Sequence, residues 1–186
     1  MNRELFNAPN TVSIIRLLCI PVFVWLIVSD NEGWAGVLLA VIGATDWVDG
    51  YLARRLNQVT EIGKLLDPIA DRIAVAVAVI AGLWAGILPA WFGWALIVRE
   101  LLVGLGAIYG WMHGITRLDV RWTGKVATFA LYAAVSGFYI GDGFDLEWLT
   151  VCAYLVGVPG LILYYWVALW YAGDMVAARR AQPEAP

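Results

Sequence analysis

Four aspartates in the first half of the chain have a type and a spacing that could carry out chemistry. They are Asp46, Asp49, Asp67 and Asp71. The first two are three residues apart and the last two are four apart, so on helices each pair projects from one face. Two such helices, packed antiparallel and joined by the polar turn near residues 57–61, would direct all four carboxylates into one cavity.

These carboxylates are hard oxygen donors, with no thiolate or imidazole among them. Such donors favour Mg²⁺, Mn²⁺ or Ca²⁺ over zinc or copper. Four carboxylates can hold two such ions, and paired metals commonly catalyse displacement at phosphorus because they stabilise both the attacking and the leaving oxygen. The predicted chemistry is therefore transfer at a phosphorus centre.

Small residues accompany the acids. Gly50 and Ala53 lie on the predicted helix face of the first aspartate pair, and Gly63 lies on that of the second. Without bulky side chains there, a flat ligand could approach the backbone. Arg54 is a candidate phosphate contact because its guanidinium presents a fork of donors.

The composition is that of a membrane protein. Of 186 residues, 62% are hydrophobic and 15% are charged, a balance typical of membrane chains. Crossing a bilayer takes roughly 20 apolar residues, and six runs approach or exceed that length: 11–29, 33–53, 65–87, 89–110, 124–141 and 148–172. We predict an all-α membrane protein with six transmembrane helices and a short N-terminal interfacial segment. It forms one domain over residues 1–186, with a tail at 176–186.

The positions of the cations predict the topology, because Lys and Arg concentrate in cytoplasmic loops. The first, third and fifth predicted connections contain no Lys or Arg. The termini and the regions around the second and fourth connections contain nine: Arg3, Arg54, Arg55, Lys64, Arg117, Arg121, Lys125, Arg179 and Arg180. Both termini and the aspartates are therefore expected at the cytoplasmic side.

Burying an aspartate side chain in a membrane costs free energy. One Asp at a bilayer centre costs about 2.5–3.5 kcal/mol on insertion scales, so four unpaired ones would cost on the order of 10 kcal/mol. Ion pairs with neighbouring arginines and lysines are the structural alternative, but they do not account for the interleaved small residues. An acid-lined transporter would more often show repeated halves with interrupted helices, and an assembly protein would have no use for the acid spacing.

The aspartate stretch also matches a known signature. From Asp46 it is D-x-x-D-G-x-x-A-R, then eight residues, then G-x-x-x-D-x-x-x-D, which ends at Asp71. This pattern resembles the signature of the CDP-alcohol phosphotransferase family, with every fixed position filled. The six predicted spans resemble the family too, so the likeness covers nearly the whole chain.

The resemblance implies a reaction and a role for each signature position. Family members hold the diphosphate of a CDP-linked substrate with two divalent cations, Mg²⁺ or Mn²⁺, and release CMP when an acceptor hydroxyl attacks phosphorus. The four aspartates would bind these ions, and Asp71 would also be the general base. The family is usually homodimeric, and no nucleic-acid partner is expected. Four positions would border the nucleotide and its diphosphate: Gly50, Ala53, Arg54 and Gly63.

The N-terminal sequence NAPNTVSIIR, residues 7–16, indicates which branch of the CDP-alcohol phosphotransferase family the chain resembles. It resembles the N-P-N-x-x-(T/S)-x-x-R motif of enzymes that make phosphatidylglycerol phosphate and of single-domain cardiolipin synthases. The donor would be CDP-diacylglycerol, and the acceptor phosphatidylglycerol or glycerol 3-phosphate. The resemblance places the chain in a bacterial cytoplasmic membrane, with the active site facing the cytoplasm.

The charge of the acceptor separates these two activities. Glycerol 3-phosphate brings a dianionic phosphate that needs several cations, whereas phosphatidylglycerol brings a neutral glycerol head on a monoanionic diester. Phosphatidylglycerol phosphate synthases show R-E-x-x-x-x-x-x-R and G-K-x-K-T, and here the second cation of each motif is replaced, by Ala107 and Ala127.

The sequence GKVATF resembles the cardiolipin synthases of high-GC Gram-positive bacteria, which makes cardiolipin synthase the favoured function. Phosphatidylglycerol phosphate synthase is the alternative, because four cations could still form an acceptor pocket: Arg99, Arg117, Arg121 and Lys125.

Overall fold

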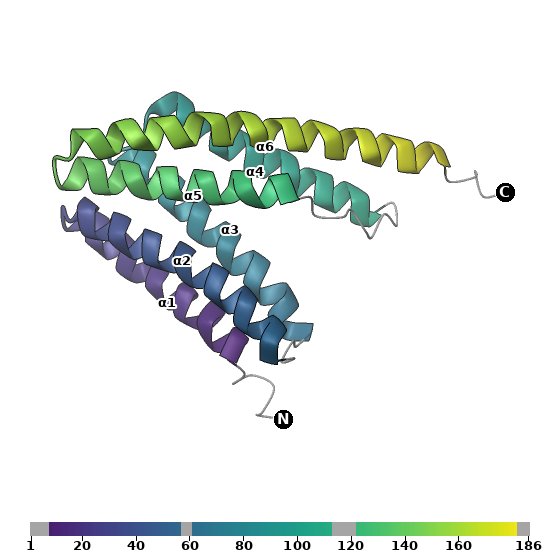
Figure 1. Ribbon diagram of the computed structural model, residues 1–186, viewed down its shortest axis with the longest axis horizontal. Coiled ribbons are helices and arrows are strands. Elements are labelled where there is room, and N and C mark those ends of the chain that lie inside the picture. The colour runs from purple at the N-terminus through teal and green to yellow at the C-terminus, as the bar shows by residue number, and fades with distance from the viewer. Residues whose placement is uncertain (1–7, 57–60, 113–121, 182–186) are drawn as a thin grey trace.

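The computed structural model describes residues 8–56, 61–112 and 122–181. Within these ranges the side chains at 8–13, 46–56, 61–71 and 174–181 lie outside the description, as do a few single ones, Lys125 among them. The described residues contain no strand, so the all-α prediction is confirmed. They form six helices (Figure 1): α1 (Ala8–Val28), α2 (Glu32–Leu56), α3 (Glu61–Trp84), α4 (Ala90–Met112), α5 (Trp122–Gly143) and α6 (Glu147–Ala181).

Each helix covers one of the six predicted apolar runs, with ends that differ by a few residues in most cases. The difference is largest in α6, which continues to Ala181, so the predicted tail is helical over residues 176–181. The last residues of this helix, MVAARRA, include good helix formers and neither Gly nor Pro, which explains why the helix continues.

The short connections use residues that tolerate a left-handed backbone. Asp30 between α1 and α2 has φ 54°, and Asp145 between α5 and α6 has φ 53°, a conformation that Asp adopts more readily than most residues. Between α3 and α4, Gly86 has φ 77°. At the start of α4, the carbonyl of Pro89 accepts a hydrogen bond from the amide of Phe92 at 2.9 Å.

The helices form two groups that diverge toward one end of the molecule (Figure 1). One group contains α1, α2 and α3 and the other α4, α5 and α6; they meet mainly where α2 packs against α5. The short connections 29–31, 85–89 and 144–146 lie at what we call the closed end. The start of α1, the ends of α2, α4 and α6, and the starts of α3 and α5 lie at the other, the open end.

The buried core lies where the two groups meet. Tyr139 of α5 is fully buried, and its hydroxyl donates to the carbonyl of Ala78 in α3 at 2.6 Å. Its ring contacts Phe23 of α1 edge to face, with centroids 5.4 Å apart. Gly36 allows α2 to approach α5 closely, because a Cβ there would lie 2.8 Å from the backbone nitrogen of Ile140.

The outer surface of the helices is apolar. Among the described side chains, one stretch is long and apolar enough to cross a membrane: Glu147–Trp170, 24 residues with a mean hydropathy of 1.8. Only 33% of its most apolar window is buried inside the protein, so most of this apolar surface faces outward. Shorter apolar stretches lie at Ile14–Val28, Glu32–Thr45 and Arg72–Trp84.

Candidate active site

The aspartate signature lies in the halves of α2 and α3 that are nearer the open end. Asp46 and Asp49 belong to α2, Asp67 and Asp71 belong to α3, and both helices are continuous through these positions. The helical spacing assumed for each pair is therefore confirmed for the backbone. These aspartate side chains lie outside the described set, so their roles stay predictions. The same holds for the four other signature positions: Gly50, Ala53, Arg54 and Gly63.

The two aspartate pairs lie at similar distances along their helices from the link between α2 and α3. Leu56 ends α2 and Glu61 begins α3, and the chain that links them spans at most about 18 Å. At 1.5 Å rise per residue, Asp46 and Asp71 each lie about 15 Å along their helix from that link, and the other two aspartates lie about 10 Å from it. The two pairs therefore lie at similar distances along their helices from the link, which is compatible with the single-cavity prediction.

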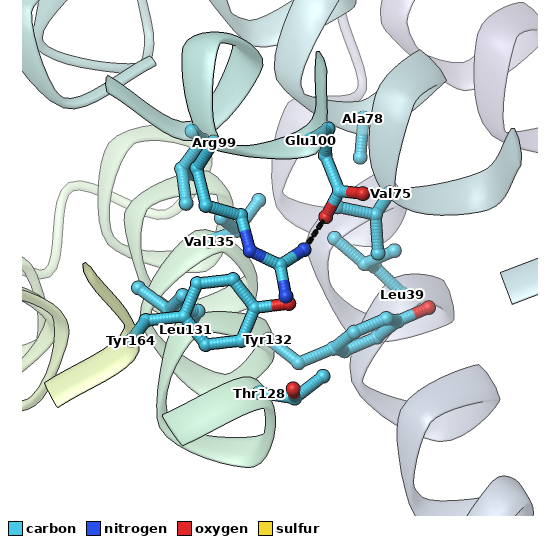
Figure 2. Close-up of a pocket in the computed structure, with 11 residues that line it drawn as sticks. Leu39, Val75, Ala78, Arg99, Glu100, Thr128, Leu131, Tyr132, Val135 and Tyr164 are labelled. Atoms are coloured by element: carbon cyan, nitrogen blue, oxygen red, sulfur yellow. Dashed lines mark hydrogen bonds and ion pairs between the residues drawn. The ribbon is translucent and has the colours of Figure 1, made fainter. Parts of the chain in front are cut away.

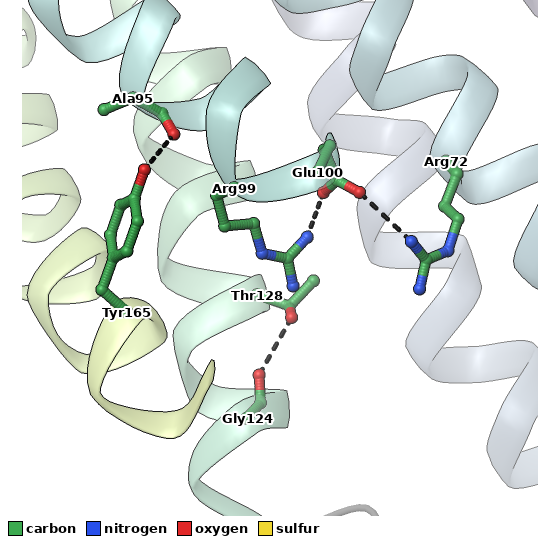
Figure 3. A network of polar contacts seen from close by, with 7 residues as sticks. All are labelled: Arg72, Ala95, Arg99, Glu100, Gly124, Thr128 and Tyr165. Carbon is green, nitrogen blue, oxygen red and sulfur yellow. Dashed lines mark hydrogen bonds and ion pairs between the residues drawn. The ribbon is translucent and has the colours of Figure 1, made fainter. Parts of the chain in front are cut away.

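A polar network begins at the residue that follows Asp71 (Figure 3). The Nη1 of Arg72 on α3 lies 3.4 Å from the Oε2 of Glu100 on α4. The other oxygen of this carboxylate, Oε1, accepts a hydrogen bond from the Nη1 of Arg99. Glu100 therefore bridges two guanidinium groups and joins α3 to α4.

Arg99 is enclosed by its neighbours. Its side chain is 11% exposed, and its guanidinium carbon lies 3.0 Å from the centroid of the Tyr164 ring on α6, a cation–π contact. Its Nε is buried and has no hydrogen-bond partner among the residues that the structure describes. The predicted acceptor cation is thus held by a carboxylate and an aromatic ring.

A small cavity adjoins Arg99 (Figure 2). Its volume is about 40 Å³, which is room for about two or three water molecules and too little for a nucleotide. Its wall is mainly apolar, with the Arg99 and Glu100 side chains at one side. The lining residues come from five helices: Leu39, Val75, Ala78, Leu96, Arg99, Glu100, Thr128, Leu131, Tyr132, Val135 and Tyr164.

The structure describes less of the other predicted acceptor-binding residues. Lys125 lies in the first turn of α5, with its side chain outside the description. Arg117 and Arg121 lie outside the described residues. Ala127, which stands where phosphatidylglycerol phosphate synthases have a second lysine, is 0% exposed. Of the four predicted acceptor cations, the structure therefore shows the surroundings of Arg99 alone.

The residues 6–173 match the family profile of the CDP-alcohol phosphatidyltransferases. The chain belongs to this family. A Mycobacterium tuberculosis protein provisionally named a cardiolipin synthase is 36% identical over 188 residues, which cover 98% of this chain and 88% of that protein. The cardiolipin synthase (CMP-forming) of Streptomyces coelicolor is 37% identical over 180 residues, or 90% of this chain and 82% of that one.

A third relative carries the other activity. The CDP-diacylglycerol–glycerol-3-phosphate 3-phosphatidyltransferase of Bacillus subtilis is 33% identical over 184 residues, which cover 90% of each chain. The family and these names make the chain an enzyme, a CDP-alcohol phosphatidyltransferase of phospholipid biosynthesis.

The CDP-alcohol phosphatidyltransferases use divalent metal ions, and the donors of this chain fit such ions. Aspartate oxygens are the ligands that Mg²⁺ and Mn²⁺ prefer, and the two pairs lie at similar distances along α2 and α3 from the link between these helices. Among the described side chains, no group of three or more His, Cys, Asp or Glu is arranged to hold a metal ion. The four aspartates therefore remain the candidate ligands.

Sequence reasoning does not identify Glu100 and Tyr164 as partners of Arg99. A signal was available, since Arg99 and Glu100 are the only charged residues in the sequence of the apolar helix α4, and charges within a membrane helix are commonly paired. Tyr164 on α6, and Arg72 on α3, which pairs with Glu100, are far away in sequence, however, and only the packing of the helices shows them.

Proposed function

We propose that this phosphatidyltransferase is a cardiolipin synthase. It would transfer the phosphatidyl group of CDP-diacylglycerol to a hydroxyl of phosphatidylglycerol and release CMP. The names of the Streptomyces and Mycobacterium relatives support this acceptor. The alternative is glycerol 3-phosphate, the acceptor in the name of the Bacillus relative.

The observation that carries the proposal is the lack of a cation at position 127. A dianionic acceptor phosphate calls for several positive partners. Ala127 is an apolar residue with 0% exposure, and the nearby Arg99 is already paired with Glu100. The neutral glycerol head of phosphatidylglycerol needs no such partners, so it suits these surroundings better.

The proposed reaction follows from the aspartate positions. Two divalent cations, Mg²⁺ or Mn²⁺, held by the four aspartates would stabilise the negative charge on the diphosphate and on the leaving oxygen. Asp71 would accept the proton of the acceptor hydroxyl. The hydroxyl oxygen then bonds to the phosphorus that bears diacylglycerol, and the bond from that phosphorus to the CMP oxygen breaks. Gly50, Ala53, Arg54 and Gly63 would border the nucleotide.

The membrane topology of the proposed enzyme has six spans in a bacterial cytoplasmic membrane, with both termini and the open end at the cytoplasm. Two features support it. The outward surfaces of the helices bear large apolar side chains, such as Leu101 at 61% exposure and Leu169 at 70%. The short connections without Lys or Arg all lie at the closed end, as the distribution of positive charge requires. The family resemblance also favours a homodimer.

The acceptor is tested with purified protein, labelled CDP-diacylglycerol and Mg²⁺ or Mn²⁺. Phosphatidylglycerol and glycerol 3-phosphate are supplied in separate reactions, and lipid products are separated by chromatography. We expect cardiolipin and CMP with phosphatidylglycerol alone. Formation of phosphatidylglycerol phosphate instead would assign the alternative activity and show that Ala127 does not decide the acceptor.

A further inference from the structure

Arg72, Glu100 and Arg99 form a charged cluster far from the ends of their helices. Arg72 lies near the middle of the 24 residues of α3, and the other two lie near the middle of the 23 residues of α4. Figure 3 shows the Glu100 carboxylate between the two guanidinium groups. Charged side chains at such depth in membrane helices cost free energy, and they commonly mark places where ligands or ions bind.

The cluster contains more positive than negative charge. Glu100 contributes one carboxylate, and each arginine contributes one positive charge. Arg99 pairs with one oxygen of that carboxylate and lies against the Tyr164 ring. Among the residues that the structure describes, neither arginine pairs with a second carboxylate. Within this part of the chain, one positive charge of the cluster therefore has no counter-charge.

Arg72 is the arginine of the cluster that a ligand can reach. Its side chain is 49% exposed, against 11% for Arg99. Its Nη1 lies 3.4 Å from the Oε2 of Glu100, whereas strong hydrogen bonds between charged groups measure about 2.7–2.9 Å. Glu100 therefore orients the Arg72 guanidinium loosely and leaves its other N–H groups to bind an anion, for which the guanidinium fork is well suited.

Apolar side chains beside the cluster indicate that this anion belongs to a lipid. Ile73, next to Arg72, is 42% exposed, and Leu101, next to Glu100, is 61% exposed. These side chains can contact acyl chains, which a soluble phosphate ester does not have. The charges agree, because the phosphodiester of phosphatidylglycerol carries one negative charge and the phosphate of glycerol 3-phosphate carries two.

We propose that Arg72 binds the phosphodiester of the phosphatidylglycerol acceptor and that Glu100 is the residue that positions it. This inference rests on the proposed function and adds to it a contact for the acceptor's anionic group. The competing explanation is that the ion pair of Arg72 with Glu100 only fastens α3 to α4.

The test measures cardiolipin formation in detergent micelles, first with phosphatidylglycerol varied at saturating CDP-diacylglycerol and then the reverse. For Arg72→Gln we expect the KM for phosphatidylglycerol to rise on the order of 10-fold, through loss of a hydrogen bond between charged groups. The kcat and the KM for CDP-diacylglycerol should stay within about 2-fold of the wild type. Arg72→Lys keeps the charge and should bring the KM for phosphatidylglycerol back to within about 3-fold.

Arg180→Gln is the matched control, because it removes one positive charge near the end of α6. Its KM for phosphatidylglycerol should equal that of the wild type. If the ion pair only fastens the helices, Arg72→Gln should lower the unfolding temperature and kcat and leave the KM for phosphatidylglycerol unchanged. That result would overturn the inference, as would a rise in the KM for CDP-diacylglycerol alone or an equal effect in the control.

A second measurement uses the wild-type enzyme. Monoacylglycerol offers the same diol as phosphatidylglycerol but has no phosphodiester, so its kcat/KM as an acceptor should be at least about 10-fold lower. Equal use of the two lipids would overturn the inference. A wild-type enzyme that uses glycerol 3-phosphate and makes no cardiolipin would instead reject the proposed function itself.

Discussion

The two ends of this helical protein are built differently. At the closed end, the connections are short and turn through Asp30, Gly86 and Asp145. There α2 and α5 meet so closely that a Cβ on Gly143 would overlap the backbone of Gly33. At the open end the two groups of helices diverge (Figure 1), and the aspartate signature lies along the halves of α2 and α3 that point there. The closed end holds the fold together, whereas the open end carries the aspartates that we propose as metal ligands.

The largest expected effect is at the open end. Asp71→Asn removes the proposed base while keeping nearly the same shape, so CMP release should fall by about 10²–10⁴-fold. Thermal unfolding in detergent should be unchanged, because the substitution keeps nearly the same side-chain size and shape. Asp142→Asn is the control, a change of the same type at the closed-end terminus of α5. Turnover by Asp71→Asn near that of the control would remove Asp71 from the base role.

Packing near the closed end should show the opposite pattern. Gly36→Val places a side chain against the backbone of Ile140, and overpacking of this kind costs typically about 1–3 kcal/mol. We expect a lower unfolding temperature, with the activity per folded molecule kept close to the wild-type value. Gly104→Val on α4 is a control, since a Cβ there meets no atom within 4 Å. Equal stability of the two variants would show that the α2–α5 contact is looser than described.

The smallest effect concerns Asp142. Burial raises the pKa of this carboxyl above its usual 3.8, with further contributions from Glu32 and Asp145. A raised pKa means that the folded state favours the protonated form, so stability is lost as the pH rises through that pKa. Asp142→Asn removes this loss and should raise the stability at neutral pH by less than about 0.5 kcal/mol.

The pH dependence checks the cause of that change. The stability gain of Asp142→Asn should shrink toward zero below pH about 4, where the wild-type carboxyl is protonated in both states. A gain that stays constant between acidic and neutral pH would show that the charge of Asp142 is not its origin.

The sequence predicted the helices well because their apolar runs are long and are separated by residues that end helices. All six runs correspond to helices. The helix α6 continues beyond the predicted apolar run, since the charged sequence after residue 175 is still favourable to helix. Charge and helix propensity are separate properties, and the loss of apolar character marks a limit of membrane burial better than a limit of the helix.

The candidate site was predicted only in part, for a physical reason. Spacing along one helix determines which residues share a face, so the aspartate pairs could be proposed from α2 and α3 separately. Contacts between helices depend on crossing angles and on side chains such as Gly36 and Tyr139 that set the approach. The placement of Arg99 against Tyr164, 65 positions later, therefore could not be read from the local pattern.

The most direct test of the aspartate site is a crystal structure with Mn²⁺ and CDP, using the anomalous scattering of manganese to locate the ions. We expect two manganese peaks between α2 and α3, each bound by carboxylate oxygens of Asp46, Asp49, Asp67 and Asp71. Carboxylates paired with arginines, with manganese elsewhere or absent, would contradict the account.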